Sequence, residues 1–434
     1  MSPLAILTIL TILLIVGLAL GLEIAFTMGI VGAIGLFFWR FGVMSLVAIS
    51  EISWDVGTSY VLNAVPLYIL MSSILTETGL STDLYTGISK WFNRIPGGLA
   101  VASTISCSVF AAISGSSVAT AYAIGIIAIP EMKKQGYDSK LASGCLCAGG
   151  TLGILIPPSI PMIIYGSLMS QSIGKLFIAG VIPGIIMSLT FIIYIMIRVM
   201  LKPSLAPGLS AEVTWLERVV ALKGAVPIVL LVIGVLGGIY TGITTPTEAA
   251  AIGVAGSVIV AGVTRRLNWT VVKRSLMASV YSMGMIFVII IGALVFAHIV
   301  SYLHIPQAFT EWLLSLNVSR WTIFIAVCIL YIILGCFMET IAILVITIPI
   351  IGPMLVSLGF DPVWFGIIMV VLIEMGLVTP PVGLNLYVIH DIMKEEQSLE
   401  KVIKGVTPFV FLMGLMLIIL SIFPQLVLWL PGRM

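Results

Sequence analysis

Two proline pairs interrupt apolar stretches of this chain, and the segments around them align with each other without a gap. The first pair, Pro157-Pro158, falls on the second, Pro380-Pro381, at an offset of 223 positions. Gly, Asp and Pro residues elsewhere keep this offset, and chance hydrophobicity does not align these residue types. The further matches are Pro130 with Pro353, Gly136 with Gly359, Asp138 with Asp361 and Gly153 with Gly376. We therefore predict an internal duplication, which is common among helical membrane proteins that contain broken helices.

The apolar content decides the class of protein. Of 434 residues, 60% are hydrophobic and 9% are charged, and a water-soluble globule cannot hide that much apolar surface. The sequence therefore predicts an integral membrane protein. A net charge of +2 with scattered basic residues gives no reason to expect a nucleic-acid partner. Five cysteines lack metal-ligand spacing and are expected to be reduced packing residues. They are Cys107, Cys145, Cys147, Cys328 and Cys336.

Ten segments are candidates for crossing a bilayer, which takes about 20 apolar residues. Eight are uninterrupted: 3–22, 24–47, 60–78, 176–200, 225–240, 248–263, 276–303 and 406–430. Two more, 141–168 and 364–389, contain the proline pairs. Segments 99–132 and 321–354 are apolar but carry glycine, polar residues and proline where a plain span would be spoiled. We expect each of these two to be a re-entrant hairpin whose tip is covered by protein.

Basic residues in short loops predict the orientation. Counting spans places five basic clusters on one face, the cytoplasmic one. They are Lys90 and Arg94; Lys133, Lys134 and Lys140; Arg198 to Lys223; Arg265 to Arg274; and Lys394 to Lys404. The loops at 171–174, 241–245 and 356–362, which fall on the external face, contain no Lys or Arg. The first hairpin then enters from the cytoplasm and the second from outside, so the repeat is predicted to be inverted. Inverted repeats give a transporter an inward-open and an outward-open state from one sequence.

The hairpin tips carry candidate ligands. The first tip reads Ser114-Gly115-Ser116-Ser117, where an unwound helix end offers oxygens to a cation or amides to an anion. A small-residue helix contact is the alternative. The second tip reads Gly335-Cys336-Phe337-Met338-Glu339-Thr340. Glu339 is an ionisable group in an apolar stretch, which marks a functional site by default. It can equally be a structural cap of the tip, and the sequence does not separate these two roles.

The proline pairs should free backbone carbonyls at membrane depth, because proline lacks an amide hydrogen and clashes with the preceding turn. These carbonyls, with the hydroxyls of Thr151, Ser159 and Thr379, are the oxygen ligands that sodium prefers. A simple kink is the alternative. The run Thr245-Pro246-Thr247-Glu248 is expected to be a helix cap rather than a chemical site. A phosphate-binding Gly-x-x-x-x-Gly-Lys-Ser/Thr motif is absent, so ATP hydrolysis by the chain is not expected.

Five runs together resemble one transporter family. They are Ser114 to Thr120, Ile129 to Met132, Gly149 to Pro161, Thr245 to Ala251 and Thr379 to Gly383. The chain resembles the large membrane subunit, DctM type, of tripartite ATP-independent periplasmic (TRAP) transporters. The resemblance implies an all-α fold in the bacterial inner membrane, with an elevator-type transport domain and a scaffold. It also implies import of an organic acid, such as a C4-dicarboxylate or sialic acid, by sodium symport with two or more Na⁺ ions.

The resemblance also implies partners and a division of the chain. The expected partners are a small four-helix membrane subunit of DctQ type, a periplasmic binding protein of DctP type, and membrane lipid. Residues 97–175 and 320–395 would form the transport domain. Residues 1–96 and 176–319 would form the scaffold and connecting spans, and residues 396–434 the C-terminal span.

Specific residues are expected at the site, and none of them is catalytic. The expected sodium ligands are Ser114, Gly115, Ser117, Gly335, Cys336, Met338, Gly376 and Thr379. The expected substrate-binding residues are Ser116, Ser117, Thr151, Ser159, Glu339, Thr340 and Asn385. A standalone ion-coupled carboxylate transporter without partners remains the alternative. A membrane-embedded enzyme is disfavoured, because a paired acid and histidine at membrane depth is missing.

Overall fold

The computed structural model describes residues 2–39, 42–207, 214–315, 318–393 and 397–433. Lys394, which belongs to the fifth basic cluster, lies outside these residues. Within the described ranges all regular structure is helical, in agreement with the predicted fold class. Among the described residues, eight helices are long and apolar enough to cross a membrane, and several shorter apolar helices accompany them.

The described residues of the first half form ten α-helices. They are α1 (Pro3–Ala19), α2 (Ile24–Trp39), α3 (Val47–Thr58), α4 (Ala64–Glu77), α5 (Leu80–Phe92), α6 (Gly98–Ser114), α7 (Ser117–Lys134), α8 (Ser139–Leu155), α9 (Ile160–Leu168) and α10 (Ile173–Leu201). Short 3₁₀ helices, η1 (Gly42–Leu46) and η2 (Pro203–Leu205), precede α3 and follow α10.

The second half repeats this order, except that one long helix takes the place of the two helices α3 and α4. Its elements are α11 (Trp215–Tyr240), α12 (Pro246–Val263), α13 (Trp269–Tyr302), α14 (Ile305–Ser315), α15 (Arg320–Phe337), α16 (Thr340–Ser357), α17 (Pro362–Leu377), α18 (Leu384–Met393), α19 (Leu399–Ile422), α20 (Gln425–Leu428) and η3 (Pro431–Arg433). Adding 223 to the residue numbers of α7 gives the bounds of α16. With the same offset, α13 spans the positions that correspond to both α3 and α4.

Residues that match each other at the offset of 223 positions form the same local turn in both halves. Gly136 and Gly359 both adopt positive φ, at 73° and 84°, at the end of a hairpin. Asp138 then caps α8 by accepting the Lys140 and Leu141 amides, and Asp361 caps α17 by accepting the Val363 and Trp364 amides. Glycine permits the left-handed backbone and aspartate satisfies free amides at a helix start. The turn from each hairpin into its broken helix is therefore encoded locally.

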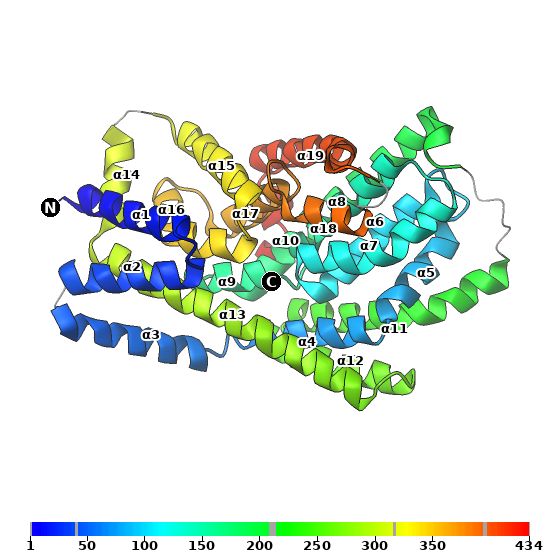
Figure 1. Ribbon diagram of the computed structural model, residues 1–434, viewed down its shortest axis with the longest axis horizontal. Helices are drawn as coiled ribbons and strands as arrows, with labels where there is room; N and C mark the ends of the chain where they lie inside the picture. Colours follow the sequence, from blue (N-terminus) through cyan, green and yellow to red (C-terminus); the bar gives the residue numbers. More distant parts are fainter. Residues whose placement is uncertain (1, 40–41, 208–213, 316–317, 394–396, 434) are drawn as a thin grey trace.

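Both proline pairs separate two helices, as predicted. Pro157-Pro158 lies between α8 and α9, and Pro380-Pro381 lies between α17 and α18. Each X-Pro bond within these pairs is cis. The segments expected to be hairpins are helix pairs, α6 with α7 and α15 with α16, joined by tips at 115–116 and 338–339. In Figure 1 the pair α6 and α7 approaches the centre from the right and the pair α15 and α16 from the left.

The packing of the two halves is exchanged, in that a short helix of each half packs against the hairpin of the other half. Helix α7 packs against α18 of the second half, while α16 packs against α9 of the first half. Within each half, α6 packs on α8 and α15 packs on α17. Each short half-helix beyond a proline pair therefore supports the hairpin of the other half.

Several elements differ from the sequence prediction. The span expected at 24–47 ends at Trp39, and a separate helix, α3, begins at Val47. Helices α5 and α14, which precede the two hairpins at equivalent positions, were not predicted. Both are short and α5 carries Asp83 and Lys90, so neither gives the long apolar signal of a membrane span.

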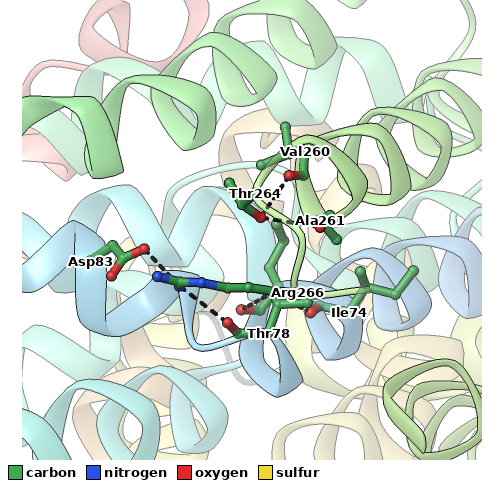
Figure 2. A network of polar contacts seen from close by, with 8 residues as sticks. Ile74, Thr78, Asp83, Val260, Ala261, Thr264 and Arg266 are labelled. Atoms are coloured by element: carbon green, nitrogen blue, oxygen red, sulfur yellow. Dashed lines mark hydrogen bonds and ion pairs between the residues drawn. The ribbon is translucent and has the colours of Figure 1, made fainter. Parts of the chain in front are cut away.

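A set of polar contacts joins two helix corners. Arg266, just after α12, contacts Asp83 of α5 at 2.7 Å and donates to the carbonyl of Thr78 at 3.2 Å (Figure 2). Arg274 of α13 contacts Glu77 of α4 at 3.6 Å. The α4–α5 corner is thereby fixed to the α12–α13 corner. The run at Thr245 is a cap, as expected: Thr245 and Glu248 form a reciprocal capping box at the start of α12.

Candidate functional site

A cavity of about 330 Å³ lies where the two hairpin tips meet helices α4 and α13. Its polar lining consists of five serines and one carboxyl: Ser72, Ser73, Ser114, Ser116, Ser282 and Glu339. A neighbouring cavity of about 650 Å³ also contains Glu339 and adds Glu23. The two tips, which are separated by more than 200 residues in the sequence, therefore share one site.

The first tip turns at Gly115, whose φ is 58°. Ser114 lies on one side of this turn, and its Oγ lies 2.6 Å from Oγ1 of Thr120. Ser116 lies on the other side and caps α7 by accepting the Ala119 amide at 3.4 Å. The carbonyl of Ser116 accepts the hydroxyl of Thr120 at 2.8 Å. Hydroxyl and carbonyl oxygens thus converge behind the tip, as the small residues predict.

The second tip is organised by Glu339. Its Oε2 accepts the amides of Ile341 at 2.9 Å and Ala342 at 3.4 Å, at the start of α16. The same side chain lines both cavities. The capping role that the sequence left open is therefore present, and the position at the cavity wall keeps the ligand role available. The α16 start carries a carboxyl, whereas the α7 start is capped by a neutral hydroxyl.

Each tip is tied to the proline break of its own half. The amide of Ile160, which follows the first break, approaches the carbonyl of Gly115 at 3.5 Å. The amide of Gly383, which follows the second break, donates to the carbonyl of Cys336 at 3.1 Å. The residues that follow the two breaks therefore bring backbone amides to the tips.

Several predicted ligands have local partners. The hydroxyl of Thr151 donates to the carbonyl of Ala148, and that of Thr379 donates to the carbonyl of Met375, both at 2.6 Å. Ser159 is fully buried and caps α9. Gly335 and Gly376 face each other in the α15–α17 contact, while Met338 ends α15 and Thr340 begins α16 as a buried residue. These residues surround the tips, but only Ser114, Gly115, Ser116 and Glu339 of the predicted set line the 330 Å³ cavity.

A third carboxyl, Glu374, lies deeper than the tips. It is 2% exposed, and its Oε2 accepts the hydroxyl of Ser117 at 2.8 Å. Ser117 in turn accepts Nδ2 of Asn385 at 2.7 Å. Sequence reasoning assigned roles to Ser117 and Asn385 but not to Glu374. The rule that selected Glu339, an ionisable group within an apolar stretch, selects Glu374 equally well.

The described residues contain no group of three or more His, Cys, Asp or Glu side chains that could hold a metal ion. All five cysteines are free thiols. The oxygens that converge at the first tip belong to hydroxyl and carbonyl groups, which are the ligand types that hard cations prefer.

A helical membrane protein in which broken helices and hairpin tips surround a small polar cavity has the architecture of a secondary transporter. Comparison with known proteins gives the family. Residues 11–426 match the family described as the tripartite ATP-independent periplasmic transporter, DctM component, and the chain belongs to it. It is therefore a transporter permease subunit and not an enzyme, and it is a multi-pass protein of the bacterial inner membrane.

Two relatives carry the same name, C4-dicarboxylate TRAP transporter large permease protein DctM. The chain is 37% identical to that of Vibrio cholerae over 96% of both chains. It is 38% identical to that of Pseudomonas aeruginosa over 87% of this chain and 88% of the relative. Among solved structures, the YdaH transporter of Alcanivorax borkumensis is similar in fold, with a TM-score of 0.62 over 90% of both chains at 16% identity.

Proposed function

We propose that this chain is the permease of a sodium-coupled importer for an organic acid. The observation that carries the proposal is the lining of the cavity between the tips. Five serines and Glu339 supply its polar groups, and none of its described lining residues is Lys, Arg or His. An anion that enters such a cavity finds no basic side chain to balance its charge. Cations must therefore enter with it, because an unpaired charge is costly away from water.

The two helix starts at the cavity suggest where a substrate carboxylate lies. Helix α7 presents its positive end behind the neutral cap Ser116. The equivalent end of α16 is already met by the carboxyl of Glu339. An anionic substrate is therefore attracted to the first tip and repelled by the second unless a cation lies between them. This arrangement supports symport of sodium with a carboxylate.

The coupling ions would bind at the tips. Ser114, Gly115, Ser117, Gly335, Cys336, Met338, Gly376 and Thr379 remain the proposed sodium ligands. Ser116 and Glu339 line the cavity and are the best placed of the proposed substrate residues. The other proposed substrate residues lie buried around the cavity and would support the residues that contact the substrate directly. They are Ser117, Thr151, Ser159, Thr340 and Asn385.

The proposed movement is an elevator. The cavity lies between the hairpin tips on one side and helices α4 and α13 on the other. Movement of the hairpins and broken helices past α4 and α13 would carry a bound substrate across the membrane. The two matched halves supply the two end states.

The family is tripartite by its description, which supports two protein partners. We propose a small membrane subunit of DctQ type and a periplasmic binding protein of DctP type that delivers the substrate. The relatives from Vibrio cholerae and Pseudomonas aeruginosa are named for C4-dicarboxylates, so a C4-dicarboxylate is the first substrate to test and sialic acid the second.

The test is uptake of radiolabelled succinate and sialic acid into proteoliposomes that contain the permease together with the small membrane subunit. Uptake is measured with and without an inward sodium gradient, and with and without the binding protein. The proposal expects accumulation that requires both. Uptake that ignores sodium would overturn the coupling, and sodium-driven uptake without the binding protein would identify a standalone transporter.

A further inference from the structure

One hydrogen-bond chain joins the two halves of the protein behind the cavity. Asn385 donates to Ser117 at 2.7 Å, and Ser117 donates to Glu374 at 2.8 Å, across 268 and 257 residues of sequence. Glu374 lies near the end of α17 and Asn385 near the start of α18, on opposite sides of the second proline break. Ser117, in the first turn of α7, therefore bridges the break in the other half of the chain.

The cluster is poorly suited to a purely stabilising role. Its three side chains are at most 2% exposed, yet Oε1 of Glu374 and Oδ1 of Asn385 have no hydrogen-bond partner among the described groups. Leaving a buried polar atom unpaired is destabilising. Apolar residues of similar size would pack here without that cost. The polar groups therefore have a role other than overall stability.

The cluster exists in only one half of the duplicated fold. At the same offset Glu374 corresponds to Thr151, Asn385 to Met162 and Ser117 to Thr340. Thr151 bonds within its own helix, to the carbonyl of Ala148. The second break is thus held by a carboxyl, an amide and a hydroxyl, and the first break lacks this set.

The first turn of α7 is held against α8 as well. A Cβ built on Gly153 would lie 2.6 Å from the carbonyl oxygen of Ser116, and one built on Gly150 would lie 3.2 Å from Nδ2 of Asn385. Glycine at both positions permits this close approach. Ser116, the neighbour of Ser117, lines the cavity. A shift of Ser117 therefore moves a residue that faces the proposed substrate.

We propose that Glu374 is a positioning residue for substrate binding. Its carboxyl, acting through Ser117, fixes the first turn of α7 against the second broken helix and so sets the position of the first tip. The role needs a hydrogen-bond acceptor at this place and does not need a negative charge. The inference rests on the proposed function for its transport readout, but the position of the turn can be measured independently of transport.

The first test compares Glu374→Ala, Glu374→Gln and Ser117→Ala in the full-length permease embedded in lipid. Hydrogen–deuterium exchange of a peptide covering residues 114–122 is the readout. Glu374→Ala and Ser117→Ala should exchange about tenfold faster there, which corresponds to loss of one or two hydrogen bonds. Glu374→Gln keeps an acceptor and should exchange as the wild type does. Unchanged exchange in both alanine variants would overturn the proposal.

The second test measures succinate uptake by the same proteins with a saturating sodium gradient and the binding protein present. Glu374→Ala should raise KM about tenfold and lower the maximal rate much less, and Glu374→Gln should restore KM. If Glu374→Gln resembles Glu374→Ala and both change the sodium requirement, the carboxylate charge is what matters and the positioning role is wrong. Failure of the wild type to take up succinate would count against the proposed substrate, while the exchange result would still decide the inference.

Ser106→Ala is the matched control for both tests. Ser106 lies in α6, is fully buried, and its hydroxyl has no partner among the described groups. Its loss should change neither the exchange of residues 114–122 nor KM. If Glu374→Ala does not fold, Ser117→Ala, which removes a single oxygen atom, carries the test.

Discussion

Gly376 faces Gly335 so closely that a Cβ built on Gly376 would lie 2.5 Å from the Cα of Gly335. The two glycines allow α17 to lie against α15 with their backbones in contact. Gly153, which matches Gly376 in the first half, likewise has no room for a side chain against the Ser116 carbonyl. In both halves the repeated glycine therefore allows the broken helix to pack closely against the hairpin of the same half. This packing role is separate from any binding of an ion by the glycine carbonyl.

Gly376→Ala should destabilise the protein, because the new methyl group meets backbone atoms that cannot rotate away. Overpacking of this kind costs about 1–3 kcal/mol, and a lower midpoint of thermal unfolding in detergent would show it. Gly414→Ala in α19 is the control, since a Cβ there meets nothing within 4 Å. Equal midpoints for the two variants would contradict the close contact.

Ser114→Ala should weaken the sodium dependence of uptake. The hydroxyl of Ser114 pairs with that of Thr120 beside the cavity, so its loss removes one of the oxygens offered to an ion. We expect the sodium concentration for half-maximal uptake to rise about tenfold, because losing one contact with the free energy of a hydrogen bond changes an affinity by about that factor. Ser275→Ala, which removes a buried hydroxyl of α13 without a partner among the described groups, should leave that concentration unchanged. A normal sodium requirement in Ser114→Ala would exclude this hydroxyl as a ligand.

Replacing both Pro157 and Pro158 by alanine should slow transport. Without prolines, α8 and α9 can join into one helix, and the Ile160 amide would then leave the Gly115 carbonyl. The measurement is the initial rate of sodium-driven uptake at equal amounts of protein in the membrane. Pro227→Ala, within α11, is the comparison and should not reduce the rate. An unaltered rate in the double variant would mean that the break is dispensable.

Arg266→Gln and Asp83→Asn should each lower thermal stability slightly and should not act additively. The pair is partly exposed, with side-chain exposures of 40% and 30%, so a coupling of about 0.2–1 kcal/mol is expected. A double-mutant cycle measured at low and at high salt checks this, because salt screens exposed charges. The exposed pair Lys404 and Glu400 of α19 serves as a weaker reference. Strict additivity at low salt would show that the Arg266 contact contributes nothing.

Residues with special backbone requirements made much of the fold predictable. Proline pairs mark the breaks, and the Gly136 and Asp138 pair marks the turn that leads from a hairpin into a broken helix. Each of these residues acts on its own neighbours, so its effect can be read without knowing the fold. The two helices that were missed, α5 and α14, are short and carry polar or charged residues, so they lack the long apolar run of a membrane span.

The site was less accessible to sequence reasoning. Ser114, Ser116 and Glu339 were found because small polar or ionisable residues stand out in apolar surroundings. The pairing of Ser117 with Glu374 could not be foreseen, since it depends on how two distant segments meet. Glu374 itself was detectable from the sequence, because it is a charged residue within an apolar segment.

The exchanged packing of α9 on α16 and of α18 on α7 makes the two halves of the chain depend on each other. Each half leaves one hairpin without the short half-helix that supports it, because that half-helix belongs to the other half. Two polypeptides cut between α10 and α11 should therefore be unstable when expressed separately, and coexpressed halves should reassemble in the membrane.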